Sequence, residues 1–302
     1  MSTLIAFALP GNDAFAKQLA RLAHCEMGSL EAHQFPDGET HLKIGTDVNG
    51  RHLALVCTLA NPNERILPLL LAADALRDSG ATRIGLVAPY LAYMRQDRRL
   101  ETGEVVTSRL FARMLSRAFD WLVTVDPHLH RYKTLAEIYS IPVRVIHAAP
   151  LIAGWIHRNV NDPVIIGPDE ESEQWVAEVA RDCGARHSVL EKTRLGDRDV
   201  KVRVRNEGLL SGSTPVLVDD IISTGNTMVE AIRAIQARSD RSPVCIAVHG
   251  IFAEGAYDIL KGTGARIVTS NTVPHESNMI DVVPLVAEAL REQDSLASDS
   301  VT

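Results

Sequence analysis

The sequence has few cysteines and no long apolar run, and both shortages restrict what the chain can be. Its four cysteines are widely spaced without a Cys-x-x-Cys pair, so they form no recognisable metal site. Cys57 and Cys245 lie in apolar runs and are expected to be buried, reduced thiols. No apolar stretch approaches the length of a membrane span. The short apolar start Met1–Leu9 lacks a basic leader, so it predicts a first strand rather than a signal peptide, and we expect a cytoplasmic protein.

An excess of basic charge is also missing. The 31 Lys and Arg residues face 38 Asp and Glu residues, which gives a formal net charge of −7. This balance indicates no nucleic-acid-binding surface, so neither nucleic acid nor membrane is an expected partner. The 302 residues are enough for two domains, and the hydrophobic fraction of 46% is typical of a globular protein.

Apolar segments of strand length alternate with segments of helical periodicity along the whole chain, which predicts an α/β fold with parallel strands. The alternation begins again near Pro150. We therefore predict two similar domains, residues 1–146 and 147–302, joined near residues 142–150. A last short helix, Pro284–Arg291, could pack back on the first domain. The expected strands include Arg83–Ala88, Trp121–Val125, Val164–Gly167 and His187–Leu190.

The run Val216–Thr227 combines an apolar strand, two adjacent carboxylates and a loop of small polar residues that leads into a helix. N–H groups at a helix N-terminus form a phosphate site, and a glycine lets the backbone approach the anion. The carboxylates suit sugar hydroxyls or a bridging divalent cation. A ribose that carries a 5-phosphate would suit both the carboxylates and the loop at the helix N-terminus. The alternative is that the run is only an acidic turn with a polar helix cap. The residues concerned are Asp219, Asp220, Ser223, Thr224, Gly225, Asn226 and Thr227.

Two stretches of the first half carry groups that could bind a nucleotide. Phe35–Glu39 contains an Asp-Gly turn signal; alone it predicts a surface hairpin, although its ring and carboxylates could also hold a purine. Pro89–Arg99 follows a predicted strand and has three arginines in five residues, which suits either a polyphosphate or a solvated loop.

Three further segments place charged groups at the ends of predicted strands. His128 and His130 follow one strand, but two histidines alone are weak evidence for a metal. Asp169 follows another. Lys192 and Arg194 alternate in a predicted loop, where they could stabilise charge on a transferring phosphoryl group or form an ordinary basic loop.

In this order, the motifs make the sequence resemble the phosphoribosyl pyrophosphate synthetases, also called ribose-phosphate diphosphokinases. The resemblance runs from the first strand to about Arg291. It rests on the segments Phe35–Glu39, Pro89–Arg98, Asp126-Pro127-His128, Pro168-Asp169, Lys192-Thr193-Arg194, Asp219–Thr227, Ser270-Asn271-Thr272 and 278–283.

The resemblance implies two phosphoribosyltransferase-type domains and a magnesium-dependent transfer of diphosphate from ATP to ribose 5-phosphate, with release of AMP. It implies a homo-oligomer with a dimer as building block, which could stay a dimer or form a tetramer or hexamer, and in which a neighbouring subunit donates the adenine-binding hairpin. Lys192 and Arg194 would be catalytic, with Arg194 also contacting substrate, and the residues of Asp219–Thr227 named above would bind ribose 5-phosphate. The implied magnesium ligands are His128 and Asp169, and the implied ATP ligands are Phe35, Asp37, Gly38, Glu39, Arg95, Gln96 and Asp97.

The sequence departs from the family pattern after Asp169. Many members carry glycines and an arginine there, whereas Glu170-Glu171-Ser172-Glu173-Gln174 follow in this chain. Two other interpretations stay open, a phosphoribosyltransferase and a non-catalytic member of the family. A phosphoribosyltransferase would leave the Arg95–Arg99 segment and the Lys192/Arg194 pair without a role.

Overall fold

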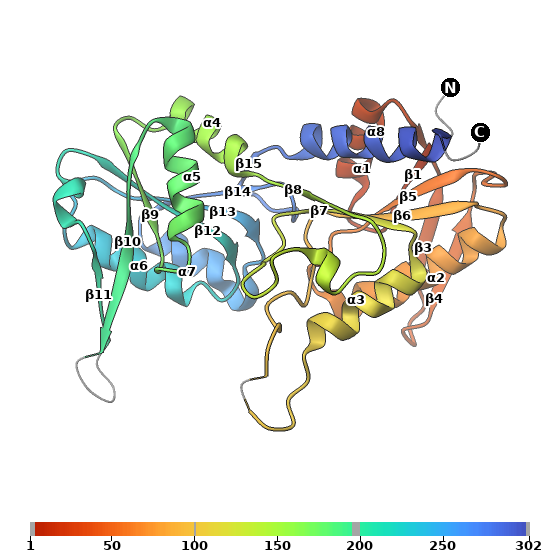
Figure 1. Cartoon of the computed structure of the whole chain (residues 1–302), viewed down its shortest axis with the longest axis horizontal. Coiled ribbons are helices and arrows are strands. Elements are labelled where there is room, and N and C mark those ends of the chain that lie inside the picture. Colours follow the sequence, from red (N-terminus) through yellow and green to blue (C-terminus); the bar gives the residue numbers. More distant parts are fainter. Residues whose placement is uncertain (1–3, 100, 195–199, 300–302) are drawn as a thin grey trace. The chain divides into compact units, whose positions relative to one another are not determined.

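The computed structural model describes residues 4–99, 101–194 and 200–299, and the chain divides into two compact units (Figure 1). Unit 1 comprises Met1–Ile146, Thr272–Pro274 and Val282–Thr302, and unit 2 comprises His147–Asn271 and His275–Asp281. Among the described residues, no helix is long and apolar enough to cross a membrane.

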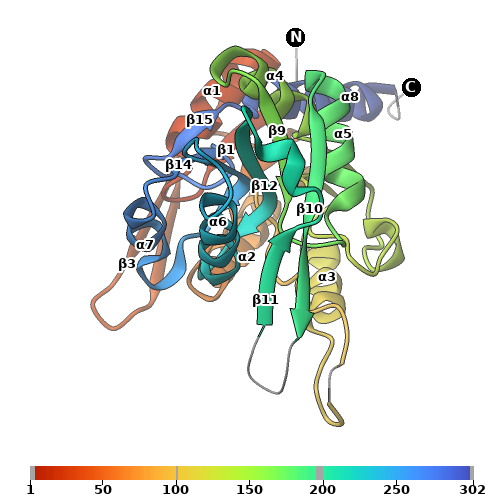
Figure 2. The same ribbon diagram turned by 90° about the vertical axis from the view of Figure 1, so that its left-hand side faces the viewer.

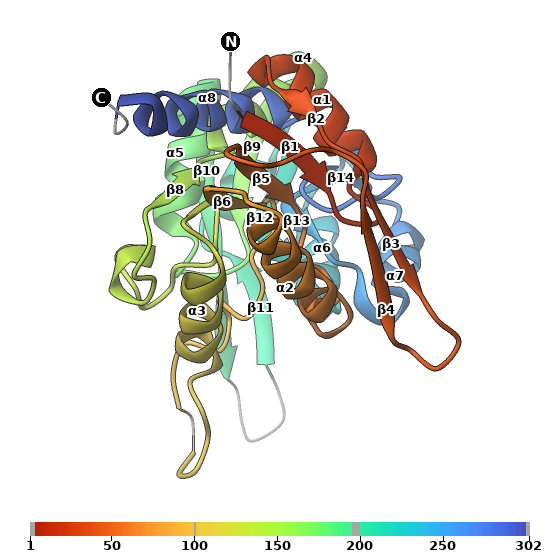
Figure 3. The ribbon, with the colours of Figure 1, turned by 90° about the vertical axis from the view of Figure 1, so that its right-hand side faces the viewer.

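Unit 1 is built on a parallel sheet of six strands in the order β2-β1-β5-β6-β7-β8. Its inner strands are continuous apolar runs because helices cover both faces. Helices α1 and α8 lie on one face and α2 and α3 on the other (Figure 3). The strands are β1 (Leu4–Ala8), β2 (Glu26–Met27), β5 (His52–Val56), β6 (Arg83–Ala88), β7 (Trp121–Val125) and β8 (Val143–Ile146); the helices are α1 (Asp13–Ala23), α2 (Pro62–Asp78), α3 (Thr107–Ala118), the 3₁₀ turn η1 (Leu135–Glu137) and α8 (Val283–Asp299).

A separate two-stranded antiparallel hairpin belongs to unit 1 as well. It pairs β3 (Leu30–Gln34) with β4 (Thr40–Ile44) and connects β2 to β5. The hairpin predicted from the Asp37-Gly38 turn signal is therefore present.

Unit 2 is built on a seven-stranded sheet in the order β11-β10-β9-β12-β13-β14-β15, in which only the β10–β11 pair is antiparallel among the described strands. Helices α4 and α5 pack on one face, and α6 and α7 on the other (Figure 2). The strands are β9 (Pro163–Gly167), β10 (Arg186–Arg194), β11 (Val200–Val204), β12 (Thr214–Ile222), β13 (Val244–Gly250), β14 (Arg266–Ser270) and β15 (Asn278–Ile280); the helices are α4 (Ala149–Asn159), α5 (Glu173–Cys183), α6 (Asn226–Gln236) and α7 (Ala256–Gly262), with 3₁₀ turns η2 (Glu207–Leu210) and η3 (Ala253–Gly255).

The parallel strands have the same order in both units. Counted along the chain within each unit, the order is second, first, third, fourth, fifth, sixth, and unit 2 adds β11 at one edge. This repetition confirms the prediction of two similar α/β folds with mainly parallel sheets.

Strand β8 (Val143–Ile146) pairs with β7 and ends where the two units divide, between Ile146 and His147. The structure corrects one expectation about the last helix. This helix is longer than Pro284–Arg291: α8 runs over Val283–Asp299 and contacts α1, β7 and β8. It is fixed to unit 1 by Arg291, whose Nη1 donates to the Leu22 carbonyl at 2.7 Å. A helix held by such contacts extends beyond the stretch that apolar periodicity alone marks.

The four cysteines are free, and Cys57 and Cys245 are fully buried as predicted. Burial raises the pKa of the Cys57 thiol to about 12, so it stays protonated at neutral pH.

Candidate active site

Three carboxylates come together at the carboxyl ends of two central strands of the unit 2 sheet. Strands β9 and β12 are parallel neighbours, so their carboxyl ends meet there. Asp169 follows β9, while Asp219 and Asp220 lie in the last part of β12. Burial of the Asp219 carboxyl, together with the negative charges of Asp220 and Asp169, raises its pKa well above the ordinary value of 3.8. The fold thus concentrates negative charge where the sequence predicts sugar hydroxyls or a cation.

The loop after β12 presents polar groups next to these carboxylates. Gly225 is the N-cap of α6, with φ of 76°, a left-handed conformation that favours glycine. No side chain of the described residues caps α6. The N–H groups of its first turn are therefore available to an anion. Thr224, Asn226 and Thr227 are exposed, and Ser223 is partly exposed.

A second loop, after β13, is hydrogen-bonded to the start of this one, although no sequence motif marks it. The N–H of Phe252 donates to the Ile222 carbonyl at 3.2 Å, and that of Ala253 donates to the Ser223 carbonyl at 3.1 Å. Phe252 itself has φ of 49°, which an aromatic residue seldom adopts. The segment after β13 therefore fixes the start of the Ser223–Thr227 loop.

Asp169 is oriented by its own turn. The Ser172 N–H donates to Asp169 Oδ1 at 3.1 Å, and the Ser172 hydroxyl donates to the Asp169 carbonyl at 2.7 Å. A Cβ on Gly167 would lie 2.2 Å from the Ser172 hydroxyl oxygen, so this turn requires glycine at the end of β9.

Lys192 and Arg194 lie on β10 rather than in a loop, which corrects the expectation of a strand ending at Leu190. The strand continues because β11 pairs with it: Lys192 faces Val202 and Arg194 faces Val200 in the antiparallel register. β-Branched residues on the second strand favour this pairing. Alternate residues of a strand share one face, so both cations are on the same face of β10. Their side chains and residues 195–199 lie outside what the structure describes.

In unit 1, the turn between β3 and β4 exposes the predicted adenine-binding residues. The Phe35 N–H donates to the Glu39 carbonyl at 2.8 Å, and the Glu39 N–H donates to Asp37 Oδ1 at 3.1 Å. Gly38 has φ of 93°. Phe35 is 45% exposed, and the rings of His33 and His41 meet its ring in T-shaped arrangements, with centroids 5.4 and 6.0 Å away.

The arginine-rich segment follows β6. Arg95 and Gln96 are exposed, whereas the Asp97 side chain is only 8% exposed. Asp97 Oδ1 lies 3.9 Å from Arg131 Nε, and its Oδ2 has no hydrogen-bond partner among the described residues. Asp97 is therefore an internal carboxylate, unlike the two residues before it.

The two predicted metal ligands lie in different units. His128, in unit 1, follows β7 and stacks on His130 with ring centroids 4.0 Å apart, while Asp169 belongs to unit 2. The described part of the chain contains no cluster of three or more Asp, Glu, His or Cys side chains arranged to hold a metal ion.

The repeated sheets and the acidic strand end with its polar loop define a protein of the phosphoribosyltransferase type. The family described as the N-terminal domain of ribose phosphate pyrophosphokinase matches residues 4–118, and the phosphoribosyl transferase domain matches residues 134–283. The ribose-phosphate pyrophosphokinase of Methanopyrus kandleri is 34% identical over 291 residues, covering 95% of this chain and 98% of that protein. The corresponding protein of Sulfurisphaera tokodaii is 32% identical over 283 residues, covering 91% and 96%.

A solved structure agrees with these relatives. Phosphoribosylpyrophosphate synthetase from Mycobacterium smegmatis superposes with a TM-score of 0.84 at 26% identity, covering 96% of this chain and 98% of that one. The chain belongs to the ribose-phosphate pyrophosphokinase family, as its motifs predicted.

Proposed function

We propose that the protein is a ribose-phosphate diphosphokinase: it transfers the β,γ-diphosphoryl group of ATP to the anomeric hydroxyl of ribose 5-phosphate, giving 5-phosphoribosyl 1-diphosphate and AMP. The observation that carries this proposal is the junction of Asp219 and Asp220 with the loop that opens α6, in a chain of this family.

Ribose 5-phosphate binds at that junction. Its phosphate accepts hydrogen bonds from the first-turn N–H groups of α6 and from the hydroxyls of Ser223, Thr224 and Thr227, with Gly225 and Asn226 shaping the loop. Its ring hydroxyls donate to Asp219 and Asp220. The sugar hydroxyls supply the hydrogen bonds that these crowded carboxylates need when ionised.

ATP binds through the elements of unit 1. The exposed Phe35 ring stacks on adenine, and Asp37 and Glu39, with Gly38 between them, accept hydrogen bonds from its amine. In this proposal the hairpin is donated by a neighbouring subunit. Arg95 and Gln96 bind the triphosphate and adenosine, and Asp97 orients that segment through Arg131.

Magnesium fits the oxygen donors that the chain offers. Mg²⁺ is usually held by one or two carboxylates and takes its other ligands from water and substrate phosphates, so Asp169 suffices as a protein anchor without a larger cluster. His128 is the second proposed contributor. When bound, the ion neutralises phosphate charge and aligns the diphosphoryl group.

The chain's own residues then provide positioning and charge. The anomeric oxygen attacks the β-phosphorus as AMP departs, so the bond to the sugar oxygen forms while the bond to the AMP oxygen breaks. Lys192 and Arg194 stabilise the charge on the group in transfer.

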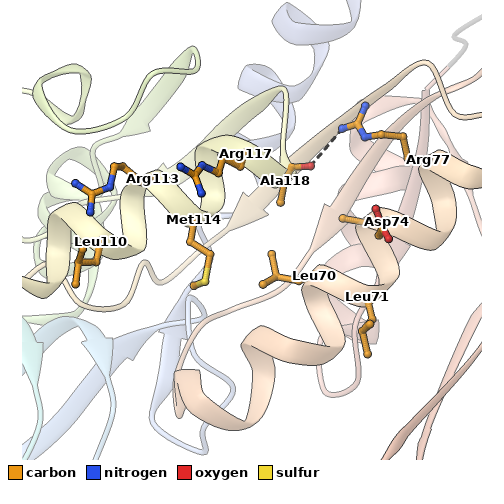
Figure 4. Close-up of a pocket in the computed structure, with 10 residues that line it drawn as sticks. Leu70, Leu71, Asp74, Arg77, Leu110, Arg113, Met114, Arg117 and Ala118 are labelled. Carbon is orange, nitrogen blue, oxygen red and sulfur yellow. Dashed lines mark hydrogen bonds between the residues drawn. The ribbon is translucent and has the colours of Figure 1, made fainter.

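A second copy of the chain is the proposed partner. Helices α2 and α3 both return from strands of one parallel sheet, so they run in the same direction and border a cavity of about 650 Å³ (Figure 4). Its lining includes Leu71 and Leu110, which are 41% and 45% exposed, beside Asp74, Arg113 and Arg117. A two-fold axis parallel to the helices would place α2 of one copy on α3 of the other. Leu71 would then pack on Leu110 of the second copy, and Asp74 would lie near its Arg113 and Arg117.

One assay tests the activity. Purified protein is incubated with ATP, magnesium and ribose 5-phosphate, and AMP is followed. Release of AMP that requires the sugar supports the proposal, whereas a folded protein that releases none contradicts it. Consumption of phosphoribosyl diphosphate that requires a nucleobase would identify a phosphoribosyltransferase instead. The cytoplasmic location stays a prediction.

A further inference from the structure

Arg205 binds three carboxylates at once. Its Nε donates to Glu191 at 2.7 Å, its Nη1 to Glu173 at 2.8 Å and its Nη2 to Glu170 at 2.9 Å. These four side chains are called the Arg205 cluster below. Its backbone is fixed too, because the Arg205 N–H donates to the Val189 carbonyl of β10 at 3.0 Å.

Each carboxylate of the Arg205 cluster comes from a different place in unit 2. Glu191 lies on β10, directly before Lys192. Glu170 directly follows Asp169. Glu173 is the first residue of α5, next to Ser172, which orients Asp169. Figure 2 shows α5 beside β10, and the two elements are in contact. The guanidinium therefore joins the Asp169 turn to the strand that carries Lys192 and Arg194.

The charge of Arg205 offsets two carboxylates of the acidic stretch after Asp169. Without a cationic partner, Glu170 and Glu173 would repel each other and add negative charge beside Asp169. Hydrogen bonds to Glu191 and Glu173 raise the pKa of Arg205, so it is a permanent cation. A lysine could not reproduce this, because it lacks the planar fork of donors that reaches several carboxylates at once.

Stability is not what the Arg205 cluster provides. The Arg205 side chain is 31% exposed and that of Glu170 is 70% exposed, and ion pairs in contact with water contribute little to the free energy of unfolding. What three donors on one rigid guanidinium do supply is geometry, since each fixes a different segment relative to the other two.

We propose that Arg205 is a positioning residue for diphosphoryl transfer: it holds the Asp169 turn and the base of the β10–β11 hairpin in one arrangement without touching substrate. The proposal depends on the proposed function. It predicts a specific kinetic signature, because the proposed ribose 5-phosphate loop follows β12, and none of the three ion pairs of Arg205 involves a residue of β12 or α6.

The test compares Arg205→Gln, Arg205→Lys and a control, Arg238→Gln. Arg238 also makes a surface ion pair in unit 2, with Glu207 at 3.1 Å, but joins none of these segments. For Arg205→Gln we expect kcat to fall about 10- to 100-fold, as misplacement of catalytic groups does. The KM for ribose 5-phosphate should stay within about 2-fold, because that loop keeps its contacts. Arg205→Lys should recover only part of the loss, and Arg238→Gln should match the unchanged protein.

A second readout does not need activity. Backbone amide exchange in β10 and α5 should become faster in Arg205→Gln, while exchange in α7, which packs on α6 and β14, stays unchanged. If the unchanged protein releases no AMP but exchange is still faster in Arg205→Gln, Arg205 does hold these segments together, and only the proposed function is rejected. If Arg205→Gln fails to fold, Glu191→Gln removes one arm of the cluster and should lower kcat in the same direction. An unchanged kcat in both variants, or an equal fall in the Arg238 control, would overturn the proposal.

Discussion

Replacing Gly225 with alanine adds one heavy atom, the Cβ, to the Ser223–Thr227 loop, the proposed ribose 5-phosphate site. Gly225 has φ of 76°, and a Cβ there would lie 3.2 Å from the Ala256 Cβ and 3.4 Å from the Leu260 Cδ1. The left-handed backbone alone costs an L-residue about 1–2 kcal/mol. The close contacts add to this cost, because α7 cannot retreat without disturbing its own packing.

The conformational cost of Gly225→Ala must lower the free energy of unfolding, weaken the binding of ribose 5-phosphate, or do both. If the loop keeps its shape, the melting temperature falls by about 2–4 °C for each kcal/mol. If the loop relaxes instead, the N–H groups of α6 no longer point at the bound phosphate. A loss of 1–2 kcal/mol in binding free energy then corresponds to a rise of roughly 5- to 30-fold in the KM for ribose 5-phosphate. The KM for ATP should change little, since its proposed ligands lie in unit 1.

Gly184→Ala is the matched control. Gly184 has φ of 68° at the end of α5, and nothing lies within 4 Å of its added Cβ. It should show the backbone cost in calorimetry without the kinetic effect. The assay is steady-state AMP release at varied ribose 5-phosphate, beside thermal unfolding of each variant. A Gly225→Ala protein with normal stability and normal KM would refute the reasoning, as would a Gly184→Ala protein with the same rise in KM.

Three more predictions concern other parts of the chain. Lys192→Ala should lower kcat by roughly 10²- to 10³-fold, with ribose 5-phosphate binding kept, as measured by AMP release and calorimetric titration. Asp219→Asn should raise the melting temperature of the ligand-free protein at neutral pH. The folded pKa of Asp219 is raised, so wild-type stability declines as pH increases from the ordinary value of 3.8 through that raised pKa, and the variant avoids this loss. Leu71→Asp should lower the mass of the proposed homo-oligomer in sedimentation, because Leu71 is 41% exposed on the proposed interface.

Each of these has an outcome that would contradict it. Equal loss of binding and turnover in Lys192→Ala would remove its assignment to the transition state. A gain in melting temperature for Asp219→Asn that is as large at pH 4 as at pH 7 would show that its charge is not the cause. Ile259 serves as the control for the interface, since it is 52% exposed on α7 in unit 2, and Ile259→Asp should leave the mass unchanged.

Central elements of the fold could be predicted from the sequence because their signals are local. Arg83–Ala88 and Trp121–Val125 were predicted with the bounds observed, since each is a continuous apolar run that ends in a turn. Edge strands were not predictable in this way. Strands β2, β8, β11 and β15 are short or only partly apolar, and they form because a neighbouring strand offers free backbone groups.

The sequence alone determined the kind of chemistry: the strand end at Asp219 with its hydroxyl-rich loop, and the order of motifs that marks the family. Only the tertiary structure decided what surrounds these groups. It placed Lys192 and Arg194 on a paired strand, enclosed Asp97 and gathered three glutamates around Arg205. The physical reason is that motif chemistry depends on residue type and spacing, whereas burial and ion pairing depend on neighbours distant in the chain.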